Sequence, residues 1–247
     1  MTLELVNAAI GYGRKALISC LDLKVNSGDV IFLSGPNGSG KSTLAKTLLG
    51  VLPLVSGRRV TDFARLAYVP QSSHFDIQYP ITVQALVAQG VRQNLALRQL
   101  LSREAGGVET RQVLEQVGLV SCAKSLLREV SGGQLQRAHF ARVLLQDAPL
   151  VLLDEPYGAI DAASVRDLAA LVRHWHGEGR TVISVLHDLE HVRQEYPETL
   201  LLAREIVARG DTATVLSEAN LLRARRLAEG RSDDAHAPIC HADQDAG

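Results

Sequence analysis

Hydrophobic residues alternate with polar ones near the start of the chain and gather into continuous runs further on. The alternation over residues 2–25 is typical of strands with one buried face, and the glycines within 11–15 predict a turn between two such strands. Largely apolar runs at 29–33, 149–154 and 181–186 predict strands that are buried on both faces. The chain therefore combines an antiparallel β part with strands of the parallel type.

Other stretches place apolar residues three and four positions apart, which is the spacing of a helix with one buried face. The predicted helices are 42–50, 82–89, 108–117, 135–144, 162–175 and 214–228, and weaker runs predict strands at 64–69 and within 200–208. Strands that alternate with helices indicate an α/β fold with a mainly parallel central sheet. We expect one domain over 1–228 with a helical subdomain inserted at about 72–148, and a polar, disordered tail over 229–247.

The composition limits the cellular compartment and the charged partners of the chain, but it does not identify the function. The chain has 247 residues, is 46% hydrophobic and carries a formal net charge of -1, so nothing draws it to nucleic acid or to an anionic membrane surface. Its three cysteines are few and far apart, which predicts no disulfide framework and suits a reducing cytosol. We see no signal peptide and no apolar stretch of the ~20 residues that span a bilayer.

A glycine-rich segment between the first buried strand and the first helix has the pattern G-x-x-x-x-G-K-S. It consists of Gly35, Pro36, Asn37, Gly38, Ser39, Gly40, Lys41, Ser42 and Thr43. Glycines let backbone N–H groups converge on phosphate oxygens, and the start of a helix adds unpaired donors. We expect Lys41 to bridge the β- and γ-phosphates of a nucleotide and the Ser42 hydroxyl to bind Mg²⁺. The alternative is a glycine-rich turn with a chance lysine.

Two carboxylates stand at the end of the apolar run 149–154. Ligands bind beyond the carboxyl ends of strands in open α/β sheets, so Asp154 is placed to bind Mg²⁺ through water. Glu155 follows at once and can face a water molecule as a general base. The alternative, two exposed acids that cap the next element, fits poorly after so apolar a strand.

Further polar residues lie at the start of a predicted helix, in a predicted turn and after predicted strands. Ser131, Gly132, Gly133 and Gln134 precede a helix and form a second anion site, unless the serine is only a helix cap. Tyr12 lies in the predicted turn, where its ring can stack on adenine or remain an ordinary exposed tyrosine. Gln71 follows the strand 64–69, and His187 follows the strand 181–186, although a lone histidine is usually structural.

Together these motifs resemble the ATP-binding subunits of ABC transporters, in their order and spacing over most of the chain. The quoted matches are GPNGSGKST, Gln71, VSGGQ at 130–134, VLLDEP at 151–156, Asp161 and His187. The resemblance implies that Gln71 contacts Mg²⁺ and the attacking water, and that His187 contacts the γ-phosphate. It also implies that the SGGQ residues bind the γ-phosphate of ATP held by the other copy of a head-to-tail homodimer, with Asp161 communicating across it.

The resemblance implies ATP and Mg²⁺ as cofactors and integral membrane permease subunits as partners, with an extracytoplasmic solute-binding protein. It would place the chain at the cytoplasmic face of the membrane. The segments 154–161 and 187–193 are most similar to the zinc/manganese and metal-chelate uptake group. His236, Cys240 and His241 offer ligands of the kind that Zn²⁺ prefers, or they are incidental residues of a solvated tail.

Several alternatives stay open from the sequence. The chain could power transport of another substrate, or be a non-transport ABC ATPase of DNA repair or translation. DNA-repair members resemble this core but carry a long coiled coil between the phosphate loop and the SGGQ segment. Residues 72–130 of this chain are too few for such a coiled coil. A P-loop kinase or GTPase would lack SGGQ, and a GTPase would have the Asn-Lys-x-Asp sequence that reads guanine.

Overall fold

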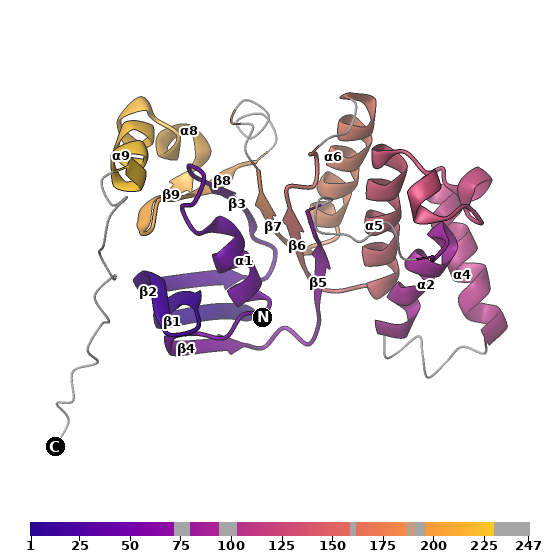
Figure 1. The fold of residues 1–247 in the computed structure, drawn as a ribbon, viewed down its shortest axis with the longest axis horizontal. Coiled ribbons are helices and arrows are strands. Elements are labelled where there is room, and N and C mark those ends of the chain that lie inside the picture. The colour runs from indigo at the N-terminus through magenta and orange to yellow at the C-terminus, as the bar shows by residue number, and fades with distance from the viewer. Residues whose placement is uncertain (72–79, 94–102, 159–161, 187–188, 190–195, 230–247) are drawn as a thin grey trace, which may run out of the picture. The chain divides into compact units, whose positions relative to one another are not determined.

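The computed structural model describes residues 1–71, 80–93, 103–158, 162–186, 189 and 196–229. It divides into two compact units, which are described separately below and are shown in Figure 1. Unit 1 consists of Met1–Phe63 and Thr181–Gly247, and unit 2 consists of Ala64–Arg180. Within the described residues, no helix is both long enough and apolar enough to cross a membrane.

Unit 1 begins with a three-stranded antiparallel sheet in the order β2-β1-β4. Its strands are β1 (Thr2–Tyr12), β2 (Lys15–Asn26) and β4 (Ser56–Thr61). The predicted turn between β1 and β2 is confirmed, with Leu3 opposite Val25 and Leu5 opposite Leu23. The sequence pattern missed β4, because an edge strand with no buried residue leaves no apolar alternation to detect.

The second set of strands in unit 1 surrounds β3 (Val30–Ser34), which is buried along its whole length. β7 (Thr181–Val185) and β8 (Glu198–Leu202) flank β3 and run parallel to it, and β9 (Ile206–Asp211) pairs antiparallel with β8. α1 (Lys41–Leu48) follows β3 and packs against β1 (Figure 1). The mainly parallel arrangement predicted from the apolar runs is confirmed in these strands.

The predicted closing helix is wrong in one respect, because the segment forms two helices, α8 (Thr212–Val215) and α9 (Glu218–Glu229). The Asp211 carboxylate accepts a hydrogen bond from the backbone N–H of Thr214 at 3.1 Å and so starts the first helix early. The Thr212 hydroxyl donates to the carbonyl oxygen of Tyr196 at 2.7 Å, which fixes this short helix to the sheet. These tertiary contacts are not visible in helical periodicity.

Unit 2 contains the parallel pair β5 (Leu66–Val69) and β6 (Leu150–Asp154) and a group of helices. The helices are α2 (Val83–Gln93), α4 (Arg103–Gln116), the 3-10 turns η2 (Val120–Cys122) and η3 (Leu127–Glu129), α5 (Gly132–Gln146) and α6 (Ala162–Gly177). α2, α4 and α5 lie side by side (Figure 1) around a core rich in leucine and valine. On another side of α5, Phe140 stacks on the buried Trp175 with ring centroids 5.5 Å apart.

Candidate functional site

The glycine-rich segment lies between β3 and α1, so the predicted strand and helix on either side of it are confirmed. Gly35 has φ 147°, and a Cβ there would lie 1.9 Å from the carbonyl oxygen of Leu202. Gly40 has φ 101°, and a Cβ there would lie 2.8 Å from a methyl group of Ile18. Both positions require glycine, because a side chain would collide with β8 or with β2.

The N-terminus of α1 is open to a ligand. Its cap residue is Gly40, which has no side chain with which to cap the helix. The ammonium group of Lys41 donates to the carbonyl oxygens of Gly35 at 2.8 Å and Pro36 at 2.9 Å. The Ser39 hydroxyl is buried and has no hydrogen-bond partner among the residues that the structure describes. A lysine held over the loop, a hydroxyl and backbone donors together suit an anion such as a phosphate group.

The remaining residues of this loop occupy the surface and the first turn of the helix. Asn37 and Gly38 are exposed, Ser42 is partly buried, and Thr43 is buried. Tyr12 ends β1 at the hairpin and is 58% exposed, so its ring is accessible. Tyr12 was predicted in the turn, but it pairs with Lys15 as the last residue of the strand, and the turn consists of Gly13 and Arg14. Its contact with adenine remains a prediction.

In unit 2 the end of β6 presents the two predicted carboxylates. Every residue of β6 is buried, and Asp154 is only 2% exposed. Glu155 is partly buried and has φ 48°, a left-handed conformation that a glutamate rarely adopts. The Gln71 amide donates to a carboxylate oxygen of Glu155 at 2.5 Å. The structure therefore brings Gln71 and Glu155 into contact directly beyond the strand ends.

Two residues of this cluster were missed by the sequence patterns. The Tyr68 hydroxyl in β5 donates to Oδ2 of Asp154 at 3.1 Å, and Arg142 in α5 donates to the carbonyl oxygen of Tyr68 at 2.7 Å. Burial and then the charge of Asp154 raise the pKa of Tyr68 well above its usual range, so the hydroxyl stays a donor at neutral pH. The alternation of β5 could have placed Tyr68 on one face, but its partner depends on the strand register.

The SGGQ segment forms the N-terminus of α5. Ser131 is the cap residue, and its hydroxyl accepts from the backbone N–H of Gln134 at 3.2 Å. The Gln134 side chain returns a contact by accepting from the N–H of Ser131 at 2.9 Å. The helix-cap alternative is therefore present in the structure, and the N–H groups of Gly132 and Gly133 are the donors that this capping box leaves to a ligand.

The donor set suits Mg²⁺. A carboxylate, a serine hydroxyl and an amide oxygen are hard oxygen ligands, which are the kind that Mg²⁺ takes beside nucleotide phosphates. Ser42 in unit 1 carries such a hydroxyl, and Asp154 and Gln71 in unit 2 carry such a carboxylate and amide. That these three residues bind one magnesium ion remains a prediction. The predicted contacts of Asp161, His187, His236, Cys240 and His241 lie outside the described residues.

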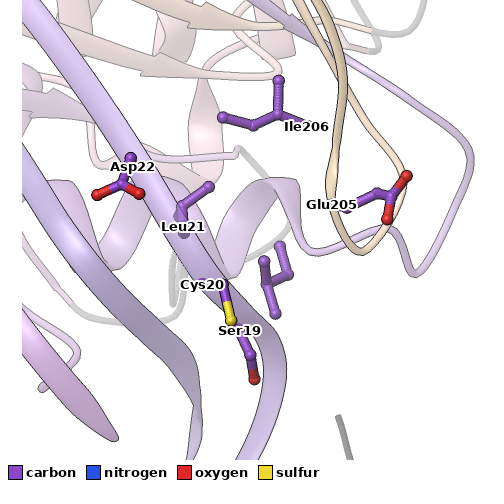
Figure 2. Close-up of a pocket in the computed structure, with 7 residues that line it drawn as sticks. Ser19, Cys20, Leu21, Asp22, Glu205 and Ile206 are labelled. Atoms are coloured by element: carbon purple, nitrogen blue, oxygen red, sulfur yellow. The ribbon is translucent and has the colours of Figure 1, made fainter. Parts of the chain in front are cut away.

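A separate pocket of about 360 Å³ lies in unit 1 between β2 and the turn that leads into β9. Figure 2 shows Asp22 and Glu205 among the residues that line it. Asp22 accepts from the backbone N–H of Asn7 at 2.8 Å, and Glu205 pairs with Arg223 at 2.8 Å. Both acids are engaged within the protein, and none of the predicted site residues lines this pocket.

Comparison with solved structures supports the predicted α/β fold with a mainly parallel sheet. The nucleotide-binding part of a transporter assigned to the metal-chelate ABC type, in an inward-facing conformation, superposes with a TM-score of 0.77 at 27% identity. That match covers 91% of this chain and 89% of the other. A nucleotide-free ATP-binding cassette from an ABC transporter gives a TM-score of 0.76 at 21% identity and supports the fold alone.

Sequence comparison identifies the family. Residues 18–158 match the family model described as "ABC transporter". The chain is 34% identical to the zinc transport system ATP-binding protein TroB of Treponema pallidum, over 94% of this chain and 92% of that protein. It is 33% identical to the manganese transport system ATP-binding protein MntB of Bacillus subtilis, over 93% and 98%. The chain belongs to the ABC transporter family, as an ATP-binding, ATP-hydrolysing subunit.

Proposed function

We propose that the chain hydrolyses Mg-ATP as a homodimer and thereby drives the import of zinc or manganese ions through membrane permease subunits. In this proposal it sits at the cytoplasmic face of the membrane, and an extracytoplasmic solute-binding protein delivers the metal ion. The likeness to zinc and manganese transport subunits over nearly the whole chain carries the choice of substrate.

For ATP binding, the open N-terminus of α1 supports a site for the phosphates. The ammonium of Lys41 would leave the loop carbonyls and face the β- and γ-phosphates. The accessible ring of Tyr12 would stack on adenine. Asp154, Ser42 and Gln71 would hold Mg²⁺, which supplies positive charge against the phosphate oxygens.

For hydrolysis, the contact between Gln71 and Glu155 is the supporting observation. A carboxylate within hydrogen-bond reach of a water molecule can accept its proton as the water attacks the γ-phosphate. The Gln71 amide holds that carboxylate in one orientation and would itself position the water. Glu155→Gln should therefore retain ATP binding and slow hydrolysis by ~10²–10⁴-fold. Hydrolysis at the parent rate in this variant would remove Glu155 from the role of base.

The presence of two helix N-termini supports the proposed dimer. One nucleotide at the phosphate loop already has the donors of α1, so those of Gly132 and Gly133 would serve a nucleotide on the other copy. Asp161 and His187 are assigned to the same interface by the family resemblance. The test mixes a Lys41→Ala chain with a Ser131→Arg chain, each inactive alone. A trans site predicts partial recovery of hydrolysis in mixed dimers. No recovery at any ratio, with mixed dimers shown to form, would contradict the trans arrangement.

The substrate is tested in cells that depend on this chain. Replacing it with the Lys41→Ala variant should abolish uptake of radiolabelled Zn²⁺ or Mn²⁺, while Lys46→Ala, in the same helix, should leave uptake intact. Loss of uptake of one metal ion and not of the other identifies the transported ion. Unchanged uptake of both ions, with the variant shown to lack ATPase activity, would assign another substrate to the transporter.

A further inference from the structure

Tyr68 lies beside Asp154 because of the register between two parallel strands. β5 and β6 pair with Tyr68 opposite Leu152, and side chains two residues apart in a strand share a face. Asp154 is therefore the diagonal neighbour of Tyr68 on the same face, within reach of a long aromatic side chain. The hydrogen bond of 3.1 Å from the tyrosine hydroxyl to Oδ2 of Asp154 uses this geometry.

The backbone of Tyr68 is fixed as well as its side chain. Its carbonyl oxygen accepts a hydrogen bond of 2.7 Å from Nη2 of Arg142, which lies in the largely buried helix α5. A hydrogen bond from a charged group is stronger than a neutral one, so the end of β5 is held firmly. Tyr68 thus links the helix that begins with SGGQ to the carboxylate at the end of β6.

We propose that Tyr68 is a positioning residue for Asp154, and that its hydroxyl holds this carboxylate in the orientation in which it receives the magnesium ion of Mg-ATP. The inference rests on the proposed role of Asp154 as a magnesium residue. An aspartate on a strand end has freedom about two side-chain bonds, and a fixed donor on Oδ2 removes most of it. Groups that orient the ligands of a metal ion in this way typically change metal affinity by 10–100-fold when mutated.

A purely structural role is the competing explanation. A buried carboxylate needs hydrogen bonds whether or not it meets a metal ion, and a tyrosine hydroxyl satisfies that need. The two explanations differ in what the loss of the hydroxyl changes. A structural role affects the free energy of unfolding, whereas a positioning role affects the affinity for the divalent ion in the nucleotide complex.

The test uses the full chain with the Tyr68→Phe substitution, which keeps the ring and the carbonyl contact to Arg142. Mn²⁺ serves as a paramagnetic probe for Mg²⁺, and protein is kept in excess over a non-hydrolysable ATP analogue. The electron paramagnetic resonance signal of aqueous Mn²⁺ then reports the concentration of unbound ion. Mn²⁺ binding to the protein without nucleotide is measured separately and subtracted. We expect the Mn²⁺ dissociation constant of the nucleotide complex to rise about tenfold, with nucleotide affinity in EDTA unchanged.

Three further variants separate the outcomes. Tyr196→Phe removes the hydroxyl of a tyrosine that is 4% exposed, in unit 1, and should leave Mn²⁺ affinity unchanged. Asp154→Asn should weaken Mn²⁺ binding at least as much as Tyr68→Phe does. The double variant should be no more than about twofold weaker than Asp154→Asn alone, because the hydroxyl acts through this carboxylate.

The Mn²⁺ affinities of these variants separate the proposed role of Asp154 from that of Tyr68. If Asp154→Asn leaves Mn²⁺ affinity unchanged, the proposed metal role of Asp154 is wrong and the inference about Tyr68 is overturned with it. If Asp154→Asn weakens Mn²⁺ binding but Tyr68→Phe lowers only the melting temperature, the hydroxyl is structural and only the inference about Tyr68 is overturned. Equal losses in Tyr68→Phe and Tyr196→Phe would also overturn it.

Discussion

The helix α1 follows a glycine-rich segment and α5 begins with two glycines, yet their N-termini are built differently. α1 begins after Gly40, and no side chain caps it. α5 begins after Ser131, and the reciprocal contacts of Ser131 and Gln134 close a capping box. At the first N-terminus the cap residue contributes no side-chain acceptor, whereas at the second the capping box satisfies two of the N–H groups.

This difference indicates two kinds of phosphate site. At α1 the donors and the Lys41 ammonium are present before any nucleotide arrives, which suits tight binding by one chain. At α5 a phosphate would meet the N–H groups of Gly132 and Gly133 and share Ser131 with the helix cap. Binding there should be weaker and should add to a site formed elsewhere, as expected of a surface that closes over ATP held by a second copy.

The largest effect is expected at the open N-terminus. Lys41→Ala should weaken ATP binding by a single chain at least ~100-fold, because two charge-assisted contacts of ~1.5 kcal/mol each are lost. Equilibrium titration with a fluorescent ATP analogue measures this, and Lys46→Ala, in the last turn of α1, is the matched control. Similar affinities in the two variants would show that Lys41 has no special role in binding phosphate at α1.

The second prediction separates capping from phosphate binding at α5. Ser131→Asp keeps a good cap residue but places a negative charge where a phosphate is expected. We expect an unchanged melting temperature, unchanged ATP binding by the single chain and an ATPase rate reduced by at least about tenfold. A variant with the parent rate would mean that Ser131 only caps the helix.

The third prediction concerns how α5 is anchored. Burial and then the charge of Arg142 lower the pKa of His139 to about 3, and the residue is 0% exposed. The pKa in the folded state lies below the unfolded value of about 6.5, so the unfolded chain binds the extra proton first as the pH falls. The contribution of neutral His139 to the free energy of unfolding is complete above about pH 6.5. It is lost progressively as the pH falls from 6.5 to 3.

His139→Leu should remove this acid sensitivity. From pH 7.5 to 5.5 the parent should lose about 1.4 kcal/mol of unfolding free energy through this group, and the variant should lose that much less. Urea denaturation at both pH values measures the difference. His176→Leu, at an exposed position of α6, is the control for the substitution of a histidine by leucine. An equal loss in parent and His139→Leu would contradict the assignment.

The smallest effect is expected when the cap of α5 is simply removed. Ser131→Ala should lower the free energy of unfolding by about 1 kcal/mol, because the N–H of Gln134 loses its acceptor. Thermal unfolding measures this change. No loss of stability would show that the capping box contributes nothing at this helix, and the contrast with α1 would disappear.

The sequence was most informative where local pattern and motif coincide. The strand, loop and helix around Lys41 follow from an apolar run, two glycines and helical spacing, and the end of β6 follows from a run that closes on Asp154. Local patterns failed where long-range contacts decide. β4 is an edge strand without apolar alternation, and the hydrogen bond from Tyr68 to Asp154 depends on which residues of two distant strands pair.

The left-handed backbone of Glu155 has a consequence for how this chain can change over time. Glycine and asparagine adopt that conformation with less strain, so the most stable chain would not carry glutamate there. Random substitution under selection for stability alone would replace the proposed base and leave a well-folded protein without turnover. Stability alone does not explain a glutamate at this strained position, whereas its proposed role as the base does, and a stabilised engineered version should leave position 155 untouched.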